Sequence, residues 1–85
     1  MTITEQIAAL VGQISNRPAP VTEDESLFEA GYLDSFTLTD LVGELERAFH
    51  IRIPDADLNP RRFDTLARIS AYVEKTRRVN HAGQS

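Results

Sequence analysis

The sequence predicts an all-α protein: a bundle of three main helices and one short helix, with a long loop between the first two main helices. Helical periodicity dominates the chain, because three segments carry apolar residues at the spacing of one helix face. The length of 85 residues allows one domain with a modest core. We place that domain at residues 1–79 and expect a disordered tail over 80–85, where polar and small residues follow one another.

The first helix is predicted near the N-terminus. Its apolar residues share one helical face: Ile3, Ile7, Leu10, Val11 and Ile14. Thr2 and Glu5 have the spacing of a capping box at its start. Asn16 and Pro18 end it.

A long ordered loop, or a loop with one short turn, is predicted from residue 17 to residue 33. Two prolines and an acidic run leave this segment without a sustained periodicity of apolar residues. Leu27, Phe28 and Leu33 are expected to hold the loop against the core. Because unstructured loops of this length are uncommon in small domains, the segment is a candidate for function.

The remaining helices follow this loop. The second helix begins at Ser35 and has one apolar face: Leu38, Leu41, Val42, Leu45 and Phe49. Asn59 followed by Pro60 predicts the short helix over residues 60–63. Asp64 and Thr65 start the last helix, whose inner face is made of four residues: Leu66, Ile69, Tyr72 and Val73.

Charge is concentrated in one third of the chain. Residues 21–50 hold eight acids and one base, a sum of −7, whereas residues 51–85 hold four acids and seven bases, a sum of +3. The first twenty residues are neutral, so the total is −4. The acidic segment is either a solvated face or a docking surface for basic partners, and charge alone does not decide between them.

Composition excludes several functions. The acidic balance argues against a nucleic-acid binder, and the apolar runs are too short to span a membrane. The absence of cysteine excludes a thiolate metal site and a cysteine nucleophile. Because the first residues lack the pattern of a signal peptide, we expect a cytoplasmic protein.

A catalytic serine is poorly supported. His50 lies a full helix from Ser35, about 20 Å at ~1.5 Å per residue, and His81 falls in the expected tail. No G-x-S-x-G elbow surrounds any serine. We therefore expect that the chain is not an enzyme and has no catalytic residue.

A metal site is also poorly supported. Asp55, Asp57 and Asn59 have the D-x-D-x-N spacing that opens an EF-hand loop. However, Pro60 stands where that loop needs glycine, and Leu66 stands where it needs glutamate. We interpret the three residues as turn-forming and expect no metal.

The segment GYLDSF at residues 31–36 is the strongest local feature. It contains the elements of a helix start, with Ser35 as N-cap or first residue, Asp34 beside the positive helix end and Phe36 as a core anchor. Alone, an aspartate followed by a serine is weak evidence for a functional site, because such residues occur at most helix starts. A long acidic loop before them and an amphipathic acidic helix after them make the signal specific.

From about Ile3 to Val73 the chain resembles the acyl carrier protein family, with its peptidyl and D-alanyl carrier relatives. The family's D-S-L or D-S-M appears as D-S-F at 34–36, the common I-P-D lies at 53–55, and Thr65 matches the threonine that often opens the last helix. The F-D-T at 63–65 and the stretch from 27 to 35 resemble D-alanyl carriers. The resemblance therefore implies a stand-alone carrier of a specialised pathway rather than of housekeeping fatty-acid synthesis.

The resemblance also implies a cofactor and partners. In the family, the serine of D-S receives 4′-phosphopantetheine from coenzyme A through a magnesium-dependent phosphopantetheinyl transferase, and cargo is held as a thioester on the arm. Carried over, Ser35 is the attachment residue and Asp34 contributes to recognition by the transferase. The acids of the second helix that would dock partner enzymes are Asp40, Glu44 and Glu46. We expect a monomer whose acyl or aminoacyl cargo comes from a loading enzyme and passes to downstream enzymes.

The cargo is expected to be short or polar. Six residues are candidates for the core or for a cavity within it: Phe28, Phe36, Leu41, Leu45, Phe63 and Leu66. Four phenylalanines would fill most of the space in a chain of this size. The alternative to a carrier is a cofactor-free helical interaction domain that binds a basic partner through its acidic face.

Overall fold

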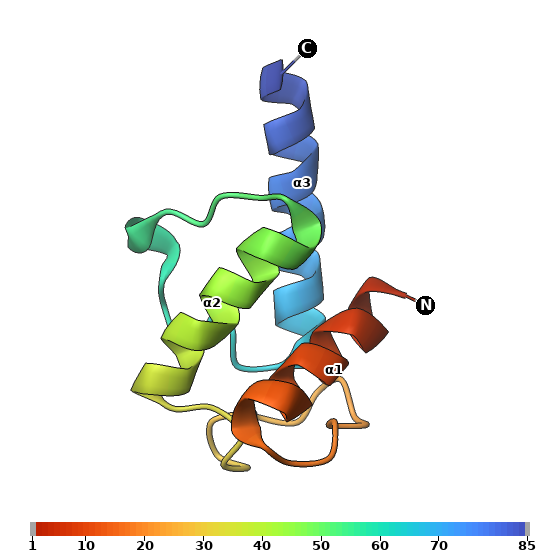
Figure 1. Ribbon diagram of the computed structural model, residues 1–85, viewed down its shortest axis with the longest axis vertical. Coiled ribbons are helices and arrows are strands. Elements are labelled where there is room, and N and C mark those ends of the chain that lie inside the picture. The colour runs from red at the N-terminus through yellow and green to blue at the C-terminus, as the bar shows by residue number, and fades with distance from the viewer. Residues whose placement is uncertain (1, 85) are drawn as a thin grey trace.

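Three α-helices make up most of the molecule in the computed structural model, which describes the backbone of residues 2–84 and the side chains of residues 2–77. They are α1 (Ile3–Ser15), α2 (Ser35–Phe49) and α3 (Leu66–Gln84), and one 3-10 turn, η1 (Asp55–Asp57), precedes α3 (Figure 1). The described residues form no strand, so the all-α prediction is confirmed. Within the same residues, no helix has the length and apolar character needed to cross a membrane.

The ends of α1 are as predicted. Thr2 Oγ1 accepts a hydrogen bond from Glu5 N, and Glu5 Oε1 accepts one from Thr2 N, which completes the capping box. Asn16 ends the helix in the left-handed conformation, with φ at 57°. A hydrogen bond of 2.8 Å between the hydroxyls of Thr4 and Ser70 joins α1 to α3.

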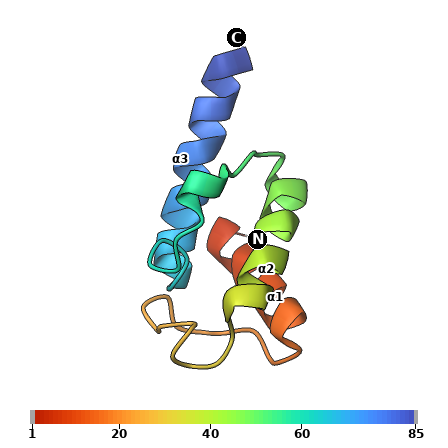
Figure 2. The ribbon, with the colours of Figure 1, turned by 90° about the vertical axis from the view of Figure 1, so that its left-hand side faces the viewer.

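The long loop between α1 and α2 is held by the start of α3. It crosses the lower end of the bundle, and Figure 2 shows it from the side. Leu27 N donates to Asp64 O at 2.6 Å, and Ser26 Oγ donates to Asp64 Oδ1 at 2.6 Å. A third bond, from Ala67 N to Glu23 O, is 3.1 Å long. The loop is therefore ordered, as the sequence predicts, with Leu27 and Leu33 buried as its anchors.

The core unites the three helices and the loops between them. Among residues 2–77, sixteen hydrophobic residues are buried in it: Ile7, Ala8, Val11, Leu27, Leu33, Leu38, Leu41, Val42, Leu45, Phe49, Ile51, Ile53, Phe63, Leu66, Ile69 and Val73. Phe28 and Tyr72 are partly buried against it.

The prediction that Phe36 anchors the core is wrong, because its side chain is 85% exposed. The helix itself explains this orientation. Phe36 precedes the buried Leu38 by two residues, which is a rotation of about 200° around α2. The two side chains therefore lie on opposite faces of the helix, and Phe36 points away from the core.

The short helix lies earlier than predicted. Residues 60–63 form a turn, closed by Phe63 N donating to Pro60 O at 3.2 Å. The helical turn is instead η1, and Tyr72 Oη on α3 donates to Asp57 Oδ2 within it at 2.7 Å. Partial burial, followed by this bond, raises the pKa of Tyr72 to about 12. A contact with a residue far along the chain thus fixes η1, which local spacing does not reveal.

The last helix begins at Leu66, one residue after the threonine that was expected to open it. Thr65 Oγ1 accepts a hydrogen bond from Arg68 N at 3.1 Å, so this threonine caps the helix. The backbone of α3 continues to Gln84, through residues where the sequence suggests a tail. The side chains of 78–84 and all of Ser85 lie outside the described residues, and the domain limit at residue 79 stays a prediction.

Two glycines in helices provide a matched stability test. A Cβ at Gly43 in α2 would meet nothing within 4 Å, whereas a Cβ at Gly12 in α1 would lie 2.9 Å from both Arg17 O and Ala19 Cα. Gly43→Ala is therefore expected to stabilise the protein by about 0.5–1 kcal/mol through helix propensity. Gly12→Ala is expected to destabilise it, because the backbone atoms that it meets must move. Urea unfolding of both variants measures the difference, and equal shifts would contradict the described packing.

Candidate functional site

Ser35 is the first residue of α2 and is exposed to solvent. Its carbonyl oxygen accepts a hydrogen bond from Thr39 Oγ1 at 3.3 Å. Its hydroxyl makes no hydrogen bond to any group in the described part of the chain. The serine oxygen is thus accessible and is not held in a competing contact.

Asp34 is the N-cap of α2, which leaves Ser35 as the first helical residue. Asp34 Oδ1 accepts hydrogen bonds from Phe36 N and Thr37 N, both 2.9 Å long. In return, Thr37 Oγ1 accepts a bond of 2.6 Å from Asp34 N, so the pair forms a capping box. The bonds from Thr37 N and then from the Thr37 side chain lower the pKa of the Asp34 carboxyl below its usual range.

The start of α2 suits a phosphodiester on Ser35. The positive end of the helix dipole favours an anion at this place. The Asp34 carboxylate already binds two of the N–H groups that a bare helix end would offer. The group therefore fits at Ser35 through the dipole and the exposed hydroxyl, rather than through a set of free backbone donors.

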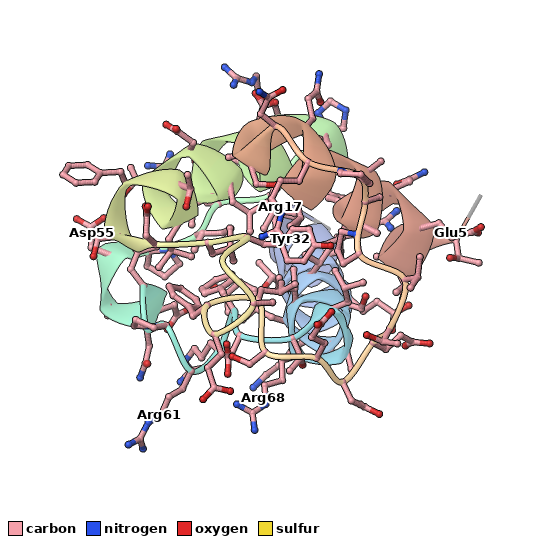
Figure 3. The ribbon with its side chains drawn as sticks, turned by 90° about the horizontal axis from the view of Figure 1, so that it is seen from below. Glu5, Arg17, Tyr32, Asp55, Arg61 and Arg68 are labelled. Carbon is pink, nitrogen blue, oxygen red and sulfur yellow. The ribbon has the colours of Figure 1, made fainter. Side chains whose placement is uncertain are left out.

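The chain that leads to Ser35 is fixed by an arginine whose role the sequence does not reveal. Arg17, just after α1, donates from Nη1 to Ala30 O at 2.7 Å, and its guanidinium lies 4.2 Å from the ring centroid of Tyr32 (Figure 3). Between these contacts, Gly31 adopts a φ of 87°, which favours glycine. These contacts hold the loop shortly before the serine.

The acids expected to dock partners differ in their surroundings. Asp40 is exposed on α2. Glu44 forms an ion pair with Arg47, one turn later on the same helix. Glu46 Oε2 accepts a hydrogen bond of 2.9 Å from Ile53 N, so this carboxylate connects α2 to the next segment.

The acids after α2 do not form a metal cluster. Asp57 accepts the hydroxyl of Tyr72, and Asn59 Oδ1 accepts a bond from Arg61 N at 2.9 Å. Throughout the described residues, no group of three or more histidine, cysteine or acidic side chains is arranged to hold a metal ion. These polar groups stabilise turns.

Comparison with known proteins decides the family. The profile of the family described as "Phosphopantetheine attachment site" matches residues 5–73. The chain belongs to this family. It is a phosphopantetheine carrier protein, and its prosthetic group is 4′-phosphopantetheine. The resemblance drawn from D-S-F and its surroundings is thereby confirmed.

Curated relatives are carriers of similar length. They include the D-alanyl carrier proteins of Streptococcus pyogenes serotype M5 (strain Manfredo), serotype M49 (strain NZ131) and serotype M1. Each is 32% identical to this carrier over 75 residues, which are 88% of this chain and 95% of the relative. The match therefore spans nearly the whole of both proteins.

Removing the Asp34 cap is expected to lower the melting temperature of the carrier. Asp34→Ala loses two bonds to helix N–H groups, whereas Asp40→Ala, on an exposed face of α2, loses none that the structure describes. Folding lowers the pKa of Asp34. The cap therefore stabilises the folded protein fully at pH values above the ordinary aspartate pKa of 3.8, and this stabilisation is lost as the pH falls through the lowered pKa. Circular dichroism melts of both variants from neutral to acidic pH measure this effect. Equal melting temperatures for the two variants at neutral pH would contradict it.

Proposed function

We propose that the phosphopantetheine arm of this carrier is attached to Ser35, and that the arm presents aminoacyl thioesters to the enzymes of a specialised pathway. The observation that supports this most directly is the exposed, unbonded Ser35 hydroxyl at the start of α2, directly after the capping Asp34. Ser35 falls within the residues that match the family.

Attachment requires one substitution at phosphorus. The Ser35 oxygen forms a bond to the phosphorus that carries the pantetheine portion of coenzyme A and loses its proton to a base of the transferase. Adenosine 3′,5′-bisphosphate leaves with the electrons of the broken phosphorus–oxygen bond. Once bound, the arm supplies the thiol that this cysteine-free chain lacks. Ser35 is thus a substrate residue, and the chemistry belongs to the transferase and the loading enzyme.

A small cargo agrees with the packing of the core. The side chains of Leu41, Leu45 and Phe63 are all 0% exposed, so the protein's own residues occupy the centre of the bundle. The curated relatives are named as carriers of D-alanine. Together with the filled core, this name favours an amino acid over a long acyl chain as the cargo of this carrier.

Partner recognition is proposed for the acidic face of α2. Asp40 is exposed and Glu44 is partly exposed, and both follow Ser35 along the helix. Glu46 adds its charge while one of its oxygens is bound by Ile53 N. The exposed Phe36 lies beside the serine and offers an apolar contact to the transferase. The partners would meet this carrier in the cytoplasm.

The test has two stages. The purified chain is incubated with coenzyme A, magnesium and a promiscuous phosphopantetheinyl transferase, and fragmentation mass spectrometry locates the added group. Attachment anywhere other than Ser35 would refute the site. The modified carrier is then offered to an amino-acid-adenylating enzyme and, separately, to an acyl-loading enzyme. Loading by the acyl enzyme alone would refute the aminoacyl cargo while leaving the site intact.

A further inference from the structure

A basic groove runs along α3 on the side of the molecule that faces away from α1 and α2. Figure 3 shows Arg61 and Arg68 extending together from this side. The first part of the groove has a volume of about 360 Å³, and the described residues that line it are Arg61, Arg62, Arg68, Ala71, Tyr72 and Lys75. A second part of about 350 Å³ shares three of these residues and adds Arg52, Pro54, Asp57 and Thr76.

The charge in the basic groove is unbalanced. Among the side chains of residues 2–77, five basic ones line its two parts, against one carboxylate, that of Asp57. These are five of the nine lysines and arginines in a chain whose net charge is −4. Asp57 already accepts the Tyr72 hydroxyl, and the one ion pair among the described side chains, Arg47 with Glu44, lies on α2. The single carboxylate therefore leaves the groove with an excess of positive charge.

The walls of the groove are held in place. Arg68 Nη1 donates to Arg61 O at 3.0 Å, which ties α3 to the turn at 60–63. Tyr72 is fixed from two sides, by its bond to Asp57 and by an edge-to-face contact with Phe63 at 5.3 Å between ring centroids. A ligand would thus meet a formed groove, which lowers the entropic cost of binding.

We propose that the basic groove binds an acidic segment of a partner protein, an extended stretch with several carboxylates and one apolar side chain. The carboxylates would pair with the arginines, whose planar guanidinium groups suit them. The apolar side chain would lie over Ala71 and the ring of Tyr72. From Arg68 to Thr76 the groove follows α3 for about 12 Å at ~1.5 Å per residue, and about four extended residues would span it.

A short segment suits the electrostatics better than a large polyanion. A long nucleic acid would extend from the groove to the −7 segment at 21–50 and would be repelled by it. A segment of about four residues stays within the groove, and salt screens the repulsion from charges more than roughly 8–10 Å away. The part of the groove between the 52–57 segment and α3 is the more recessed one, and a recess suits a chain segment better than a flat lipid surface. The groove is also separate from the acidic face of α2, so a partner with both a basic and an acidic surface would contact the carrier twice.

The full-length chain, labelled with ¹⁵N, is titrated with a synthetic peptide that contains several glutamates and one leucine. We expect chemical-shift changes at the amides of 61–62 and 68–76, and weaker binding at higher salt. Arg62→Glu is expected to weaken binding about fivefold to tenfold. Arg47→Glu, the matched control, changes the net charge equally on α2 and is expected to leave binding unchanged. Lys75→Glu serves as a second groove variant if Arg62→Glu does not fold.

Four results would overturn the proposal. One is equal binding of a peptide with glutamine in place of glutamate, and another is equal weakening by Arg47→Glu. The third is a set of shifts on α2 instead of α3, and the fourth is binding of phosphatidylglycerol vesicles or inorganic phosphate in the groove when the peptide does not bind. Attachment of the arm to Arg62→Glu is measured in parallel, and an unchanged yield would show that the groove acts independently of Ser35.

Discussion

Ser35→Ala is expected to abolish attachment of the phosphopantetheine arm, with no product at the mass of the modified protein. Ser35 carries the unbonded hydroxyl at the start of α2, because the Thr37 hydroxyl is hydrogen-bonded to Asp34 and the Thr39 hydroxyl donates to Ser35 O. The fold is expected to remain, since the serine hydroxyl makes no described contact and alanine favours a helix. Intact mass after incubation with the transferase and coenzyme A measures the result, and a melting curve confirms folding.

Thr39→Ala is the matched control for this experiment. It removes a hydroxyl from the same exposed end of α2, where its bond to Ser35 O is 3.3 Å long. This variant is expected to be modified to completion. Retained modification of Ser35→Ala would exclude the serine as the attachment residue, and loss in both variants would point to damage of α2 instead.

Phe63→Ala is expected to have the largest effect on stability. The side chain is 0% exposed and packs edge to face against Tyr72. Removing a buried phenylalanine ring typically costs about 3–5 kcal/mol, a large share of the stability of so small a domain. Thermal unfolding is expected to begin more than ~10 °C earlier, given about 4–8 °C for each kcal/mol at this size.

Phe36→Ala is the counterpart to Phe63→Ala, because the same substitution is made at a side chain that is 85% exposed. We expect a stability change within about 0.5 kcal/mol, as for surface positions in general. The rate of modification by the transferase is expected to fall, because an apolar contact beside Ser35 is lost. Comparable destabilisation by the two variants would mean that Phe36 is packed in the core after all.

The sequence was sufficient to predict the helices and most of their ends. Apolar spacing located all three helices, because each must bury one face. The capping residues Thr2, Asn16 and Thr65 then set the boundaries, since they satisfy backbone groups through local contacts. The exposure of Phe36 follows from its position relative to Leu38, which places it on the outer face of α2.

Features that depend on distant contacts could not be predicted. The signal at Asn59 and Pro60 is a valid local turn signal, but the bond between Tyr72 and Asp57 favours the helical turn at 55–57. The bond from Ile53 N to Glu46 likewise joins residues whose approach depends on tertiary packing. The basic groove arises from the placement of the 52–62 segment against α3.

The sequence singled out Ser35 as the candidate attachment residue, an assignment that stays a proposal, but it did not reveal the local structure around that serine. D-S-F and its surroundings carry the resemblance on which the assignment of Ser35 depends, and the family match over residues 5–73 includes this serine. The sequence did not show that Thr37 completes the cap, because glutamate or glutamine is the usual residue at that position. Nor did it show that Arg17 holds the approach to the serine, which requires the loop to fold back on the end of α1.

The attachment of the long loop to Asp64 and Ala67 has a consequence for the order of folding. A ribosome makes the chain from its N-terminus, so α1, the loop and α2 emerge before the residues that bind the loop. Until the start of α3 has been synthesised, Glu23, Ser26 and Leu27 have no partner for these three hydrogen bonds. The approach to Ser35 therefore reaches its final form late in translation, which restricts recognition of the finished site to nearly complete chains.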